Sequence, residues 1–335
     1  MASNSFSGPN TSNQPTLALS EVTRKLIQSE KLQDQALGLY VMAHLAGSDA
    51  MESERLNYPG CNYPDDCSSK PFDAMLRARS ANAEPLVKLA LANNDANVYA
   101  TALYACLGIK TGACGKLSYA RWAQMEPDNA AAWLSAASEA ESRKDSAARI
   151  AALQRAADAK SYNSRLPQLA EVVQSDSVQA QPPLTLTTVY ATLFSAGAAS
   201  SIGMLSSAAS YCGRKEIMDE ARIALCDALA TKIADKDETL VAAMIAKSIG
   251  ERIGWSAERL QLYKDEYAVA TGQIFEGFDD ENMLSCESIT KSNQRLLRTL
   301  RVGERAAARE TVEKSGKTLA EAAAEYRKRR PESVK

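Results

Sequence analysis

Histidine is almost absent from this sequence, because His44 is the single one among 335 residues. Serine and cysteine nucleophiles of the common hydrolases depend on a histidine base, and many zinc sites use several histidines. His44 lies among apolar neighbours in a helical pattern, so we expect a hydrogen-bonded or surface residue rather than a catalytic base. The scarcity of histidine favours a chain that is not an enzyme and that holds neither metal nor cofactor.

Aromatic residues are also scarce, at 6% of the chain. Valine and isoleucine are sparse, and segments that alternate apolar with polar residues are nearly absent, which argues against extensive β-sheet. Alanine, by contrast, is abundant. It has the highest helix propensity, and its small side chain lets helices approach closely. The composition therefore predicts an all-α fold.

An excess of charge of either sign is missing too. The 39 basic and 41 acidic residues give a net charge of −2, so no electrostatic footprint for nucleic acid or an anionic membrane is present. The basic run 327–330 ends the last expected helix, where cations are favourable. Residues 177–213 carry no charge, but hydroxyl side chains interrupt their apolar content. We expect no transmembrane segment there, and instead a buried helix pair broken around Gly197 or Gly203.

Six of the seven cysteines form close sequence pairs, and each pair flanks a turn. The pairs are Cys61 with Cys67, Cys106 with Cys114, and Cys212 with Cys226, which leaves Cys286 unpaired. Zinc binding would need CxxC spacings or nearby histidines, and neither is found. Local disulfides are the favoured interpretation, and reduced core cysteines are the alternative.

Disulfides indicate an oxidising compartment, so we predict a periplasmic or secreted protein. The sequence starts with a polar segment that lacks the apolar core of a signal peptide. We therefore expect the mature form of an exported protein with an initiator methionine added.

The chain divides into four segments by composition. Residues 1–16 are predicted to be disordered, 17–175 form a first helical half, 176–183 a polar linker ending in two prolines, and 184–330 a second helical half. Within the halves we expect one helix from about 17 to 46 and one terminal helix from about 303 to 330. Short helices joined by tight turns must be antiparallel neighbours, so stacked hairpins are predicted.

The segment from about 94 to 160 resembles a tetratricopeptide repeat. Pro127 and Trp133 have the six-residue offset of that repeat. The small or apolar positions of its two helices are filled by Ala137, Ala140, Leu153 and Ala156, whereas the closing proline expected near Ser161 is missing. The resemblance implies a superhelix of antiparallel helical hairpins, here cross-linked by disulfides. The run 121–133 with its flanking cysteines is also similar to uncharacterised exported helical proteins of Gram-negative bacteria.

The aromatic residues of the repeat-like region allow two interpretations. Tyr99, Tyr104, Tyr119 and Trp122 either pack between helices or form exposed anchors of a concave binding surface. In the second case Tyr99 and Trp122 are the best candidates.

A superhelix of this kind acts by binding another protein, so a scaffold or assembly role is the leading hypothesis. An immunity or inhibitor protein that neutralises a toxin or a secreted hydrolase is the first alternative. A carboxylate-dependent cell-wall hydrolase is the second, less favoured because the acidic clusters 65–66 and 279–281 lie in loops before helices, where capping explains them.

Overall fold

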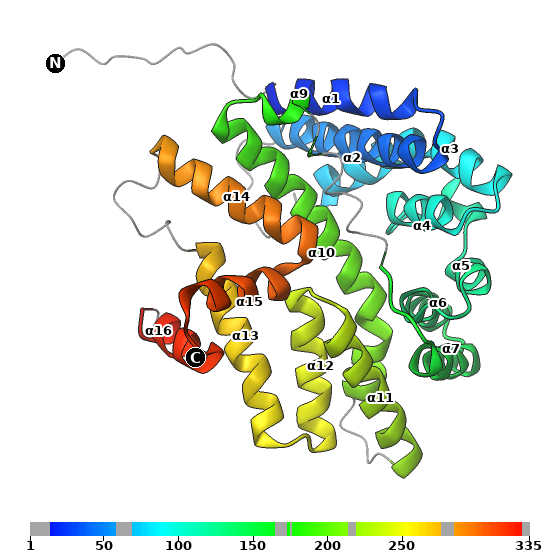
Figure 1. Cartoon of the computed structure of the whole chain (residues 1–335). Helices are drawn as coiled ribbons and strands as arrows, with labels where there is room; N and C mark the ends of the chain where they lie inside the picture. Colours follow the sequence, from blue (N-terminus) through cyan, green and yellow to red (C-terminus); the bar gives the residue numbers. More distant parts are fainter. Residues whose placement is uncertain are drawn as a thin grey trace.

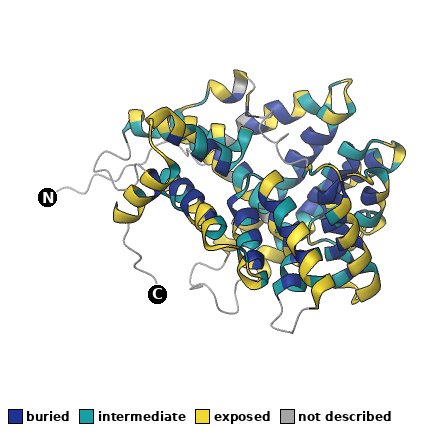
Figure 2. Cartoon of the chain, turned by 60° about the horizontal axis from the view of Figure 1, so that its bottom comes forward, coloured by how far each residue is buried: buried dark blue, intermediate teal, exposed yellow. Residues whose placement is uncertain are grey.

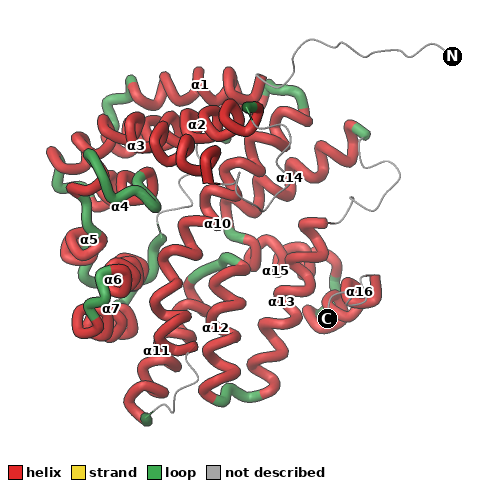
Figure 3. The backbone as a smooth tube through the Cα atoms, turned by 180° about the vertical axis from the view of Figure 1, so that it is seen from behind, coloured by secondary structure: helices red, strands yellow, loops and turns green. Residues whose placement is uncertain are grey.

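The computed structural model describes residues 14–57, 69–164, 173–174, 176–213, 219–275 and 285–329. Every regular element in these ranges is helical (Figure 3). The one sheet-like contact among them is an isolated bridge between Asn129 and Ser161. The prediction of an all-α fold is therefore confirmed.

The helices follow one another with short connections (Figure 1). The first group comprises α1 (Gln14–Ile27), α2 (Leu32–Leu56), α3 (Ser69–Ala92), α4 (Ala96–Ala105), the 3-10 helix η2 (Cys114–Lys116), α5 (Tyr119–Met125), α6 (Ala130–Ser142) and α7 (Ser146–Asp158). The second comprises α9 (Asp176–Gln179), α10 (Pro183–Gly213), α11 (Glu220–Lys236), α12 (Leu240–Ile253), α13 (Ala257–Phe275), α14 (Cys286–Val302), α15 (Glu304–Ser315) and α16 (Leu319–Arg329).

Helix α10 is the centre of the molecule. It packs against α1 and α6 of the first group and against α12 and α14 of the second (Figure 1). A continuous buried cluster runs through both groups, and buried residues follow the inner faces of their helices (Figure 2). A smaller cluster, which includes Leu240, Val269, Val312 and Ala323, joins α12, α13, α15 and α16. The two predicted halves therefore share one core, built around α10.

Local capping explains where most helices begin. A side chain just before the helix accepts a backbone N–H of its first turn, which satisfies a donor that the helix itself leaves unpaired. The residues that do so are Asp95, Ser118, Asn129, Asp145, Asp219, Thr239, Ser256, Ser285 and Thr318. Helices α12 and α15 end at Gly254 and Gly316, whose φ angles of 86° and 68° favour glycine.

Two expected helices are divided in the structure. The helix predicted over 17–46 is α1 followed by α2, because Ser29 Oγ donates to Asp34 and Gln35 Nε2 donates to the Ser29 carbonyl, both at 2.7 Å, which fixes a turn there. The terminal helix predicted over 303–330 is α15 and α16, separated at Gly316.

The predicted break near Gly197 or Gly203 is absent, since α10 runs as one 31-residue helix through both glycines. Residues 176–179 of the predicted linker form α9. Residues 1–13 of the segment expected to be disordered lie outside the described ranges. Among the helices that the structure describes, none is both long and apolar enough to cross a membrane.

Gly250 and Gly197 provide a matched test of helix packing. Trp255 covers Gly250 so closely that an added Cβ would lie 2.2 Å from its ring, whereas a Cβ at Gly197 meets no described atom within 4 Å. We expect Gly250→Ala to lose about 1–3 kcal/mol of unfolding free energy through overpacking. Gly197→Ala should gain about 0.5–1 kcal/mol, because alanine is the better helix former. Urea unfolding of both variants measures these changes. Equal changes in the free energy of unfolding, of the same sign, would contradict the close packing of Trp255 on Gly250.

Candidate functional site

Two of the three predicted disulfides are present. Cys106–Cys114 joins the end of α4 to η2 with a Cα–Cα distance of 5.4 Å, and Cys212–Cys226 joins the end of α10 to α11 at 5.7 Å. Cys61 and Cys67 lie outside the described residues. Cys286 is an exposed free thiol.

The aromatic residues proposed as exposed anchors lie in the interior instead. Tyr99 and Trp122 are 0% exposed and Tyr104 is 5% exposed, while Tyr119 is half-buried. Buried tyrosine and tryptophan keep partners for their polar atoms. Tyr99 Oη accepts the Ser118 amide (3.1 Å), and Trp122 Nε1 donates to Glu126 (2.6 Å). These side chains pack between helices, and the binding-surface interpretation is corrected accordingly.

His44 also differs from expectation. It packs beside Tyr40 with ring centroids 6.1 Å apart, and its Nδ1 is buried without a hydrogen-bond partner. Burial, with a smaller contribution from the nearby Arg79 charge, lowers the pKa of His44 from 6.5 to about 4. The imidazole of this half-buried residue therefore stays neutral in the folded chain at pH 7.

The lowered pKa of His44 predicts acid sensitivity. The unfolded chain takes up a proton at His44 below pH 6.5, but the folded chain does so only near pH 4. Stability supplied by this group is therefore complete above pH 6.5 and is lost as the pH falls towards 4. We expect a loss of about 2 kcal/mol at pH 5 that is missing in His44→Leu. Urea unfolding at pH 7.5 and 5 compares the two proteins, and an identical pH dependence would contradict this origin.

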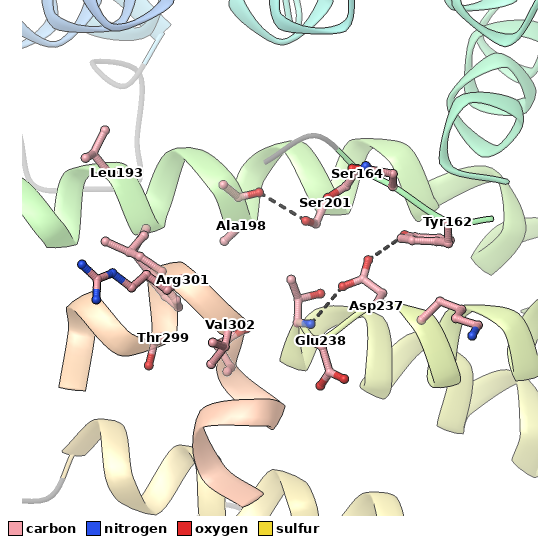
Figure 4. Close-up of a pocket in the computed structure, with 18 residues that line it drawn as sticks. Tyr162, Ser164, Leu193, Ala198, Ser201, Asp237, Glu238, Thr299, Arg301 and Val302 are labelled. Atoms are coloured by element: carbon pink, nitrogen blue, oxygen red, sulfur yellow. Dashed lines mark hydrogen bonds between the residues drawn. The ribbon is translucent and has the colours of Figure 1, made fainter. Parts of the chain in front are cut away.

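A pocket of about 220 Å³ lies where α10 meets three connecting segments. Four stretches of chain line it (Figure 4). They are residues 162–164 after α7, one face of α10 from Leu193 to Ser201, residues 236–239 between the end of α11 and the start of α12, and residues 299–304 from the end of α14 to the first residue of α15. We call this the junction pocket.

Two carboxyl groups of the junction pocket converge on the start of α12. Asp237 Oδ1 accepts the Thr239 amide at 2.9 Å, and Glu304 Oε2 accepts the Leu240 amide at 2.7 Å. Both acids therefore lie at the positive end of the α12 dipole, where negative charge is stabilised. Tyr162 Oη donates to the other oxygen of Asp237 at 2.6 Å (Figure 4).

The surroundings of the junction pocket disfavour further negative charge. Burial, and then the proximity of Asp237, raise the pKa of Tyr162 well above 10. Burial also raises the pKa of Glu304, with a further contribution from the Asp237 charge, although the hydrogen bond from Leu240 opposes it. Glu304 and Asp237 are thus two neighbouring acids in a poorly solvated site.

Neither acid has an ion-pair partner among the described residues. Arg305 lies close by but donates to the backbone carbonyl of Asp237 (2.9 Å), not to its carboxylate. Arg301 is exposed and points away from Asp237 (Figure 4). The walls are otherwise largely apolar, formed by residues such as Leu193, Phe194 and Val302. The junction pocket therefore presents two acids without an ion pair beside largely apolar walls, with Lys236 and Arg301 also in its lining.

This site was not predicted from the sequence. Asp237 and Glu304 are distant in sequence, and each lies at a helix boundary, so each looks like an ordinary capping residue. The described part of the chain contains no group of three or more histidine, cysteine, aspartate or glutamate residues placed to hold a metal ion.

Neither a protein-family model nor a curated protein nor a solved structure matches the chain. The tetratricopeptide-repeat resemblance therefore stays a prediction. In the hairpin that carries it, Trp133 Nε1 donates to the Pro127 carbonyl at 2.9 Å. The segment after α7 returns to the start of α6, where the Ser161 N–H donates a hydrogen bond to the Asp128 carbonyl at 2.9 Å.

Proposed function

We propose that this chain is an exported helical protein that binds another protein, in a scaffold or assembly role, and that its junction pocket receives a basic side chain of that partner. The observation that carries the proposal is the pair Asp237 and Glu304, which line the pocket and form no ion pair with a described residue, although Lys236 and Arg301 also line it. Buried charges in proteins are normally paired. A lysine or arginine from outside would supply the missing partner.

The size of the junction pocket supports a side chain rather than a whole small molecule. Its volume of about 220 Å³ is below the range of about 300–1,000 Å³ that encloses drug-sized ligands. Apolar walls suit the methylene stem of lysine or arginine, and the acids suit the charged end. Export is supported by the two disulfides, which persist in oxidising compartments.

A carboxylate-dependent hydrolase is a weaker account of the same residues. Glycoside cleavage needs two carboxyl groups that are free to exchange protons with substrate. Here Asp237 and Glu304 each already accept a backbone N–H at the start of α12. Capping explains their position, and the pocket leaves little room for a sugar chain.

Glu304→Gln tests the proposed role of the pocket. The amide oxygen of glutamine can still accept the Leu240 N–H, so the fold is kept while the charge is removed. A photo-reactive amino acid replaces Val302 in the otherwise unchanged chain and in the Glu304→Gln variant. In cells that make the unchanged chain, it should cross-link the partner. We expect the cross-link, mapped by mass spectrometry, to centre on a lysine or arginine and to fall at least tenfold in Glu304→Gln.

Glu287→Gln is the matched control, because Glu287 is exposed on α14 and pairs with Lys291 there. It should leave the cross-link unchanged. The proposal would be contradicted if the unchanged chain, Glu304→Gln and Glu287→Gln cross-linked the partner with equal yield. It would also be contradicted if the cross-linked region of the partner lacked basic residues. A strict one-to-one complex that abolishes the activity of a toxin or hydrolase would indicate the immunity or inhibitor role instead.

A further inference from the structure

A second concave surface lies on the α12–α13 hairpin, away from the junction pocket. It has a volume of about 850 Å³ and is lined in part by α16. Its lining comes from Ala243, Met244 and Lys247 of α12, from α13 positions between Gln261 and Gly272, and from Tyr326 and Arg327 of α16. We call it the hairpin groove. Helices α12 and α13 lie side by side in Figure 1, with α16 next to α13.

The hairpin groove is apolar and aromatic at its base. Tyr263, Tyr267 and Tyr326 all line it, and Met244 and Tyr267 are 45% and 42% exposed. Large apolar side chains exposed together in a concavity mark interaction sites, and tyrosine, methionine and arginine are enriched in protein interfaces. The groove therefore has the composition of a surface that a partner covers.

Every charged side chain that lines the hairpin groove is basic. These are Lys247, Lys264 and Arg327, and the lining includes no aspartate or glutamate. Lys247 pairs with Glu251 at 2.7 Å, and Arg327 pairs with Asp265. Lys264 has no ion pair among the described residues. The free charge of the groove is therefore positive, which complements an acidic partner.

The floor of the hairpin groove is preformed. Tyr326 packs so closely on Gly272 that an added Cβ would lie 2.2 Å from its ring, which fixes α16 against α13. The lining of α13 from Gln261 to Gly272 spans about 16 Å of helix axis. That length accommodates about three helical turns, as in recognition of an amphipathic helix by a groove.

We propose that the hairpin groove binds an acidic amphipathic segment of a partner protein, with an apolar or aromatic side chain over Met244 and Tyr267 and a carboxylate on Lys264. The proposal stands independently of the junction pocket, because the two sites share no lining residue and have opposite charge. Failure of one therefore leaves the other intact.

A displayed library of random twelve-residue peptides, selected on the full chain, tests this proposal. We expect the selected peptides to be richer in aspartate and glutamate than the starting library and to carry at least one large apolar residue. Their affinity should fall at least tenfold in Lys264→Glu combined with Tyr267→Ala, and raised salt should weaken binding. Bound peptide should also protect Lys264 from acetylation, measured by mass spectrometry.

Lys116→Glu, an exposed position at η2, is the control and should bind as the wild type does. Glu304→Gln should also bind the peptides normally, which separates this groove from the junction pocket. Circular dichroism and melting temperature establish that the groove variant is folded. An absence of selected peptides, a selection without acidic bias, or equal binding by the groove variant would overturn the proposal. Tighter binding of a twelve-nucleotide oligothymidine to the same residues would overturn it in favour of nucleic acid.

Discussion

Replacement of Arg305 by alanine should lower the free energy of unfolding by about 3–5 kcal/mol. Arg305 and Glu266 have side chains that are each only 6% exposed, and they pair at 2.7 Å. Arg305 also donates to the carbonyls of Ala234 and Asp237. Removal of the guanidinium leaves a buried carboxylate and two carbonyls short of a donor. Urea unfolding at pH 7 measures the loss.

Arg298→Ala is the control for Arg305→Ala. Arg298 also donates two hydrogen bonds to a glutamate, Glu310, but at an exposed surface. Water replaces the lost contact there, so the change in stability should be much smaller. Arg309 also contacts Glu266 at 2.9 Å and retains part of its neutralisation. Similar losses in the two variants would contradict the view that burial gives Arg305 its importance.

Loss of the Cys212–Cys226 bridge should cost about 3 kcal/mol. The bridge closes a loop of 14 residues and ties α10, the central helix, to α11. Without it the unfolded chain gains conformational freedom that the folded chain does not share. The double variant Cys212→Ala with Cys226→Ala, unfolded in urea beside the oxidised wild type, provides the measurement.

Cys286→Ser is the control for this experiment, because Cys286 is an exposed free thiol and its replacement should leave stability unchanged. A reductant should destabilise the wild type and Cys286→Ser alike, and it should affect the double alanine variant less. Equal sensitivity of all three proteins to reductant would show that the Cys212–Cys226 bridge contributes little.

Features that depend on a few neighbouring residues could be predicted from the sequence. Asn129, a residue type that commonly caps helices, caps α6 through a hydrogen bond at 3.1 Å that needs only the next residues of the chain. The Cys106–Cys114 bridge spans 8 residues and flanks a visible turn. Alanine content and the absence of alternating patterns were sufficient for the all-α class.

Features that depend on distant segments could not be predicted in this way. The glycines of α10 suggested a break, but packing of that helix against both groups of helices outweighs the cost of about 1 kcal/mol per glycine. Trp122 lies on α5, a helix of 7 residues, too short to show which face is buried. The junction pocket brings Tyr162, Asp237 and Glu304 together from three separate segments, and no local pattern indicates that they meet.

Both observed bridges join a cysteine to the next cysteine along the chain, Cys106 to Cys114 and Cys212 to Cys226. A polypeptide that enters an oxidising space from its N-terminus exposes the members of each pair one directly after the other. An oxidase that links thiols in their order of arrival would produce these two native bonds at once. If the chain is exported as proposed, its biogenesis should therefore need an oxidant for these two bonds but no isomerase to correct their pairing.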